Sequence, residues 1–76
     1  RRIQLVKHAK AEAESAKVSI RNARRDANEE IRQLQKDGLG EDSAKSAEDT
    51  IQKTTDSYIS KVDAFLEAKE KDIMTV

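Results

Sequence analysis

The stretch "KDGLGED", from Lys36 to Asp42, is where this 76-residue chain is expected to change direction. It holds both glycines of a sequence that has no proline, and residues that favour helices dominate on either side. Gly38 is placed to end a helix in the left-handed conformation, with Lys36 in the last turn, where a cation complements the helix dipole. Gly40 can act as a modest N-cap, followed by Glu41 and Asp42 in the first turn of a second helix. The stretch therefore predicts helix, short loop, helix.

On either side of this break, the sequence predicts one helix over about residues 1–37, a loop over about 38–40 and a helix over about 41–75. Each helix would be roughly 50 Å long at 1.5 Å per residue. A loop this short makes the two helices antiparallel neighbours. The predicted fold is therefore all-α, an antiparallel pair of long helices that form a hairpin.

Apolar residues recur along both helices at helical spacing. The seam of the first helix is rich in alanine and comprises Ile3, Val6, Ala9, Ala13, Ala16, Ile20, Ala23, Ala27, Ile31 and Leu34. The second helix has two adjacent stripes, one with Ala44, Ala47, Ile51, Tyr58, Val62 and Phe65, and the other with Thr55, Ile59, Leu66 and Ile73. So wide an apolar face usually contacts two neighbouring helices, and the hairpin supplies one. We therefore expect two thirds of a three-helix bundle or, for the hairpin in isolation, self-association into a dimer of four helices.

Composition excludes several classes of function. The chain has no Cys and one His, so a disulfide framework and a thiolate or His-rich metal site are excluded. Its 15 basic and 15 acidic residues cancel, which excludes a globally polycationic protein but allows a local basic patch. No serine has a neighbouring His, so we expect no catalytic residue. We also expect no metal and no cofactor. No apolar run approaches the roughly 20 residues of a membrane span. We expect a piece of a longer cytoplasmic protein.

Three arginines crowd the segment "SIRNARRDAN", at Arg21, Arg24 and Arg25. With Ile20 at zero on a helical wheel and 100° per residue, they fall near 100°, about 40° and roughly 140°. Further cations share this side and acids gather on the other side, so charge is segregated around the helix. The cations are Lys7, Lys10, Lys17 and Arg32, interrupted by Glu14, and the acids are Glu12, Asp26 and Glu30.

Within three or four positions on their own helix, Arg21 and Arg24 have no acidic residue, and Arg25 has Glu29 in the less favourable order. Like charges at this spacing each cost a few tenths of a kcal/mol. Arginine also makes planar, bidentate contacts with phosphate. We therefore interpret Arg21, Arg24 and Arg25 as a phosphate-binding stripe on a rigid helix, called the arginine stripe below.

An alternative interpretation assigns these charges to helix pairing. Arg24 borders the apolar seam, so its side chain can lie over the core and pair with Asp56, Asp63 or Glu67 of the second helix. The chain would then be a structural coiled-coil or helical interaction module that does not bind RNA. Such a module would keep its self-association without the arginines and would have no RNA affinity to lose. The alanine-rich seam and the absence of Trp argue against a third interpretation, an amphipathic helix that lies on a membrane surface.

Four segments of the sequence resemble the carboxy-terminal part of ribosome recycling factors. They are "AKVSIRNARRDAN", "KDGLGED", "IQKTTDSYISKVD" and "KEKDIMTV", and the resemblance covers essentially the whole chain. The "RNxRRDA" and "QKxTDxYIxKVD" patterns are its most specific parts. The resemblance implies a fragment of the bundle domain I, namely the second and third helices of its three-helix bundle. The first bundle helix and the inserted domain II would lie outside this chain.

The resemblance also implies a function. The family acts in translation with elongation factor G, and it splits the ribosome after termination without making or breaking a bond. Its bundle lies against large-subunit ribosomal RNA, and the full-length protein meets elongation factor G. By resemblance, the RNA-binding residues are the arginine stripe on the RNA-facing side and Arg2 near the hinge toward domain II. The sequence departs from the family at Gly40, where the family often has Ser, which weakens the helix cap.

Overall fold

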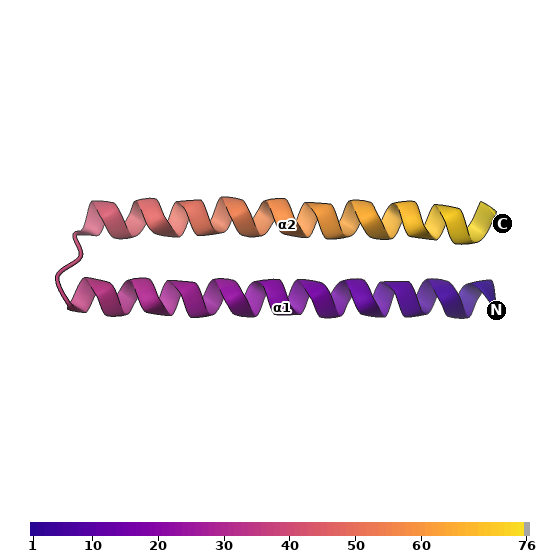
Figure 1. The fold of residues 1–76 in the computed structure, drawn as a ribbon, viewed down its shortest axis with the longest axis horizontal. Coiled ribbons are helices and arrows are strands. Elements are labelled where there is room, and N and C mark those ends of the chain that lie inside the picture. Colours follow the sequence, from indigo (N-terminus) through magenta and orange to yellow (C-terminus); the bar gives the residue numbers. More distant parts are fainter. Residues whose placement is uncertain (76) are drawn as a thin grey trace.

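The computed structural model describes residues 1–75, and in this range the chain forms two helices joined by a short turn (Figure 1). Helix α1 spans Arg2–Lys36 and helix α2 spans Glu41–Thr75, with 35 residues each. The helices lie side by side and antiparallel in a rod of 57 × 15 × 7 Å. Both ends of the chain lie at the end of the rod opposite the turn. The all-α helical hairpin predicted from the sequence is confirmed.

Backbone hydrogen bonds around Gly38 end helix α1. Gly38 has a φ of 117°, in the left-handed region that disfavours any side chain. Its N–H donates to the Gln35 carbonyl at 3.1 Å, and the Leu39 N–H donates to the Leu34 carbonyl at 2.9 Å. These two bonds form a Schellman motif, which satisfies carbonyls that the helix end would otherwise leave without donors. Gly38 is therefore the left-handed terminator that the sequence predicts.

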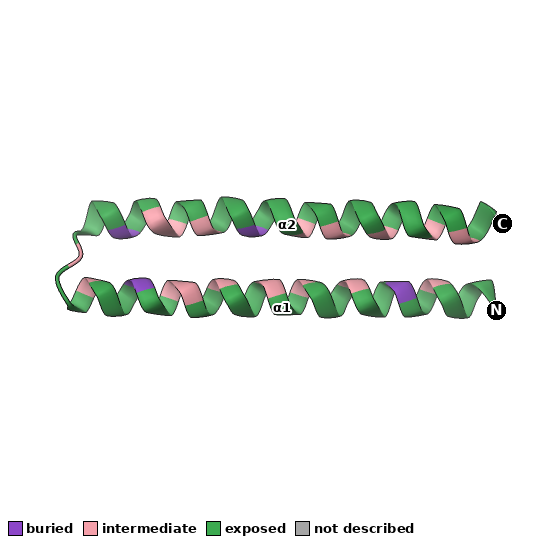
Figure 2. Ribbon diagram, viewed as in Figure 1, coloured by how far each residue is buried: buried purple, intermediate pink, exposed green. Residues whose placement is uncertain are grey.

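Small and medium side chains bring the two helices together. Ala9 and Ile31 of α1 and Ala44 and Thr55 of α2 are buried, and they lie on the sides of the helices that face each other (Figure 2). Half-buried neighbours extend this contact along the rod: Val6, Ala13, Ile20 and Ala27 on α1, and Ile51, Ile59, Val62, Leu66 and Ile73 on α2. The Thr55 hydroxyl donates to the Ile51 carbonyl at 2.7 Å, so this buried polar group is satisfied.

Several residues of the predicted apolar faces lie outside this contact. On α1, Ile3 is 68% exposed and Leu34 is 53% exposed, while on α2 Tyr58 is 54% exposed and Phe65 is 70% exposed. Tyr58, which belongs to the predicted apolar stripe of α2, is therefore left largely uncovered by α1. A seam with steps of three and four spreads around the helix, and one straight neighbour covers only part of it.

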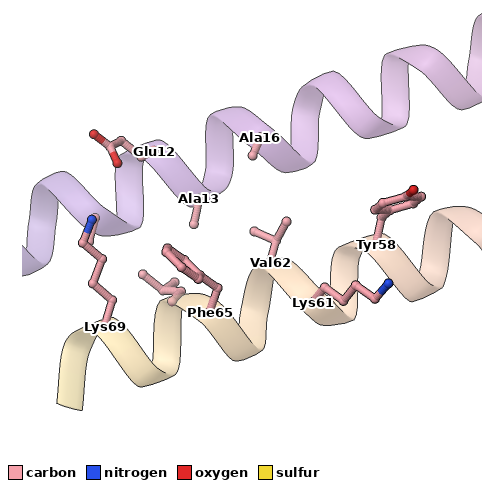
Figure 3. A pocket seen from close by; sticks show the side chains of 10 residues that line it. Glu12, Ala13, Ala16, Tyr58, Lys61, Val62, Phe65 and Lys69 are labelled. Carbon is pink, nitrogen blue, oxygen red and sulfur yellow. The ribbon is translucent and has the colours of Figure 1, made fainter. Parts of the chain in front are cut away.

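Of these uncovered residues, Leu34, Tyr58 and Phe65 line a groove between the helices, which we call the open groove. Near the chain ends, Figure 3 shows Val62 and Phe65 of α2 pointing toward Ala13 and Ala16 of α1, with Tyr58 further along α2. Beyond Tyr58 the groove continues toward the turn, where its lining includes Ile20, Ala23, Ala27, Ile51, Ile31, Leu34 and Ala47. The open groove thus follows most of the rod on one side, as the wide apolar faces predicted.

Candidate nucleic-acid interface

Helix α1 brings three of the four predicted RNA-binding residues together. Arg21 and Arg25 are exposed and Arg24 is half-buried, all within about one and a half turns of the helix. Arg2 is exposed in the first turn of the same helix, roughly 28 Å from Arg21 at 1.5 Å per residue. The arginine stripe is therefore one local cluster, and Arg2 is a separate cation near the end of the rod.

The partners of Arg21 and Arg25 differ from the expectation. Arg21 has an acid on its own helix, because its Nη1 lies 3.5 Å from Oε1 of Glu14, two turns earlier. The Arg25 Nε lies 3.8 Å from Oδ1 of the adjacent Asp26, rather than meeting Glu29. All four side chains are between 48% and 71% exposed. Ion pairs this exposed contribute little to stability, so a phosphate can replace either carboxylate at small cost.

Arg24 is the member of the stripe that reaches the other helix. Its Nη1 donates to Oε1 of Gln52 at 3.4 Å, and Nε2 of Gln52 donates to Oδ1 of Asp56 at 2.9 Å. Arg24 therefore crosses to α2, as the pairing alternative foresaw, but it contacts a neutral amide rather than a carboxylate. Within residues 1–75 it forms no ion pair.

This contact is one rung of a ladder between the helices. Lys17 pairs with Asp63, and the Lys10 Nζ lies 3.9 Å from Oε1 of Glu70. On α1 the three cations are seven residues apart, and so are the three acids Glu70, Asp63 and Asp56 on α2, which keeps the rungs on one side of the hairpin. We call the Lys10–Glu70, Lys17–Asp63 and Arg24–Gln52–Asp56 contacts the polar ladder.

Arg21 and Arg25 lie on the side of α1 away from the open groove, whereas Arg24, the third member of the arginine stripe, lines the groove. With Ile20 at zero, Ala16 and Ala23, which line the open groove, fall near 320° and about 300°. The positions of Arg21 and Arg25, near 100° and about 140°, lie beyond the polar ladder on the other side. A third helix in the open groove would therefore leave Arg21 and Arg25 exposed and would lie beside Arg24.

Two other kinds of site, a metal centre and a membrane-spanning helix, find no support in the described part of the chain. Residues 1–75 contain no group of three or more His, Cys, Asp or Glu side chains that could hold a metal ion. His8 lies 2.7 Å from Glu12 on the exposed surface of α1. Neither of the two described helices is long and apolar enough to cross a membrane. The arginine stripe is therefore the strongest candidate site of the hairpin.

Comparison with known proteins decides the family. The family model described as ribosome recycling factor matches residues 1–74. The chain belongs to the ribosome recycling factor family. The resemblance of the four sequence segments is thus confirmed over nearly the whole chain.

Relatives in this family include the ribosome-recycling factors of Flavobacterium psychrophilum, 53% identical, and Flavobacterium johnsoniae, 54% identical, each over 76 residues. The factor of Bacteroides fragilis is 55% identical over the same length. These matches cover all of this chain but 41% of each relative, so the chain spans less than half the length of these ribosome recycling factors. No solved structure gave a significant match.

Sequence reasoning missed Gln52, the side chain of α2 that accepts a hydrogen bond from the arginine stripe. A glutamine carries no charge, so a search for acidic partners passes over it. The rest of the polar ladder did leave a signal, because Lys10, Lys17 and Arg24 recur every seven residues, as do the acids opposite them. This spacing identifies partners only once the antiparallel register is known.

Proposed function

We propose that this chain is the RNA-facing part of a ribosome recycling factor, which acts in the cytoplasm to dissociate ribosomes after translation termination. In the proposed mechanism, the full-length protein works with elongation factor G, and the hairpin binds large-subunit ribosomal RNA through the arginine stripe and Arg2. The hairpin makes and breaks no bond, and it needs no cofactor. Phosphate contacts position the rod without reading the RNA sequence.

The accessibility of the arginine stripe supports this proposal most directly. Arg21 and Arg25 are held only by exposed acids of their own helix, which phosphates can displace at little cost. Arginine presents several donors in one plane and matches phosphate oxygens in pairs. A long, straight rod that carries the arginine stripe is suited to the recognition of a preformed RNA shape.

We further propose that the open groove holds the first helix of domain I, from the part of the protein outside this chain. Tyr58 and Phe65 would then be covered, which accounts for large apolar side chains that this hairpin leaves exposed. The relatives are more than twice as long as this chain, so they have residues for such a helix. Because Arg21 and Arg25 lie on the side of α1 away from the groove, they can bind RNA while a helix occupies the groove.

Binding of the full-length protein to isolated large ribosomal subunits at two salt concentrations tests the RNA proposal. The test variant carries Arg21→Gln, Arg24→Gln and Arg25→Gln, and we expect it to lose most of its affinity and part of its salt dependence. A matched control replaces three exposed lysines of α2 with glutamine, at Lys45, Lys53 and Lys71, and removes the same charge.

Equal losses in the two triple variants would show that net charge, rather than the stripe, governs binding. Unchanged affinity in the arginine variant would favour the alternative, a structural helical module whose charges set helix pairing. Circular dichroism must show the same helicity in both variants, so that unfolding does not imitate a loss of contacts.

A further inference from the structure

The arginine stripe contains one side chain that differs from its two neighbours. Arg21 and Arg25 pair with acids of their own helix and are largely exposed. Arg24 is half-buried at the contact with α2, and its link is to Gln52 on that helix. The position of its guanidinium therefore depends on the second helix, whereas the other two arginines depend only on the first.

Asp56 sets which end of the Gln52 amide faces Arg24. An ionised carboxylate only accepts hydrogen bonds, so it must be approached by the NH₂ end of the amide. Gln52 Nε2 donates to Asp56 Oδ1 at 2.9 Å, one turn along the same helix. The carbonyl end is then left to accept from Arg24 Nη1. Asp56 thus acts on Arg24 through Gln52 and never pairs with it directly.

A neutral acceptor suits an arginine that must still bind an anion. A guanidinium has five N–H donors in a fixed plane, and the contact with Gln52 uses Nη1. Its remaining donors can still form a bidentate contact with phosphate. A carboxylate at the same place would compete with phosphate for Arg24, because both are anions and both can accept two parallel hydrogen bonds from the guanidinium.

We infer that Gln52, oriented by Asp56, is a positioning residue that presents the Arg24 guanidinium to ribosomal RNA. This inference rests on the proposed RNA-binding function of the stripe, and it adds two residues of α2 that do not touch RNA themselves. Arg24 is the RNA contact, and the amide fixes its side chain before binding, which lowers the entropy lost when phosphate is bound.

A double-mutant cycle in the full-length protein tests the inference, with affinity for isolated large ribosomal subunits as the readout. We expect Gln52→Ala to weaken binding about threefold to tenfold, as for the loss of one side-chain hydrogen bond. In a protein that already carries Arg24→Ala, the same change should have no further effect. Gln33→Ala is the matched control, since Gln33 is an exposed glutamine with no side-chain contact to the stripe.

A second variant separates positioning from simple tethering of the helices. Gln52→Glu keeps an acceptor for Arg24 but makes it anionic. We expect it to bind large subunits more weakly than Gln52→Ala, because the new carboxylate competes with phosphate. If Gln52 only held the two helices together, Gln52→Glu would leave the affinity for large subunits unchanged. Affinity equal to that of the unmodified protein would therefore overturn the inference. The Tm of each variant is measured alongside.

The outcomes also separate this inference from the proposed function. If Arg24→Ala weakens binding and Gln52→Ala does not, the positioning role is wrong and the RNA contact stands. If Gln52→Ala weakens binding equally with and without Arg24, the glutamine acts elsewhere and the inference is wrong. If Arg24→Ala keeps full affinity, both the inference and the assigned role of Arg24 fail.

Discussion

Lys17 of α1 and Asp63 of α2 form an ion pair across the hairpin, and the Lys17 side chain is only 17% exposed. The lysine side chain is therefore largely withdrawn from water, and its charge depends on its partner more than that of a surface lysine would. The pair is also the middle rung of the polar ladder. Its loss should therefore weaken the contact between the two helices.

We predict that Asp63→Asn lowers the free energy of unfolding by about 1–2 kcal/mol, since Lys17 keeps its charge while its partner loses one. Asp63 is itself 53% exposed, which keeps the cost below that of a fully buried pair. The measurement is urea unfolding of the full-length protein, followed by circular dichroism. Glu67→Gln is the control, because Glu67 is exposed and forms no ion pair in residues 1–75. Equal losses in the two variants would contradict the assigned role of the pair.

Replacement of Phe65 tests whether the open groove is covered in the full-length protein. We predict that Phe65→Ala costs about 2–4 kcal/mol there, as for a buried aromatic side chain. In the isolated 76-residue chain, where the ring is 70% exposed, the cost should be within about 0.5 kcal/mol. Denaturant unfolding of both proteins measures the difference.

Val18→Ala serves as the control for Phe65→Ala. Val18 is 45% exposed and does not line the open groove, so its replacement should have a similarly small effect in both proteins. A Phe65→Ala cost that is equally small in the two proteins would mean that no helix covers the ring.

The two glycines of the turn should respond in opposite ways to substitution. Gly38→Ala should destabilise the protein by about 1–2 kcal/mol, because an L residue is strained in the left-handed region. Space is not the reason, since an added Cβ would meet nothing within 4 Å at either glycine. Gly40→Ser should instead stabilise it by a few tenths of a kcal/mol, through a better N-cap. Thermal unfolding by circular dichroism checks both, and a stabilising Gly38→Ala would contradict the Schellman assignment.

Arg2 should act independently of the arginine stripe. The two sites are roughly 28 Å apart along α1, well beyond the distance at which mutations usually couple. We predict that Arg2→Gln weakens binding to large ribosomal subunits by the same factor in the unmodified protein and in the triple arginine variant. Titrations at a fixed salt concentration measure both factors. Unequal factors would show that the two regions bind as one unit.

The helix–turn–helix arrangement could be predicted because the residues that determine it are close together in the sequence. Gly38 ends α1 through hydrogen bonds contained within the six residues 34–39, and long runs of helix formers extend on both sides. The division of the apolar residues between α2 and the open groove could not be predicted in the same way. A helical wheel shows that Phe65 and Leu66 lie on an apolar face, but only the position of the neighbouring helix shows which of them it covers.

The candidate site divides in the same way into features that neighbouring residues determine, which could be predicted, and contacts that depend on the folded arrangement, which could not. The clustering of Arg21, Arg24 and Arg25 is visible in the sequence. Glu14, the partner of Arg21, is seven residues away and lies outside the spacings of three and four residues at which helical ion pairs are expected. The two long side chains nevertheless meet across two turns of the helix. The Gln52 contact depends on the antiparallel register, which the turn sets and the helices themselves do not reveal.

Because both ends of the hairpin lie opposite its turn, a pull on the two ends would load the rungs of the polar ladder one after another (Figure 1). The Lys10–Glu70 contact would break first, then Lys17–Asp63, and the Arg24–Gln52 contact would follow. Such unzipping needs far less force than sliding two 35-residue helices past each other, where all contacts resist at once. The hairpin is thus mechanically soft to peeling from its open end and stiff to shear along its 57 Å length.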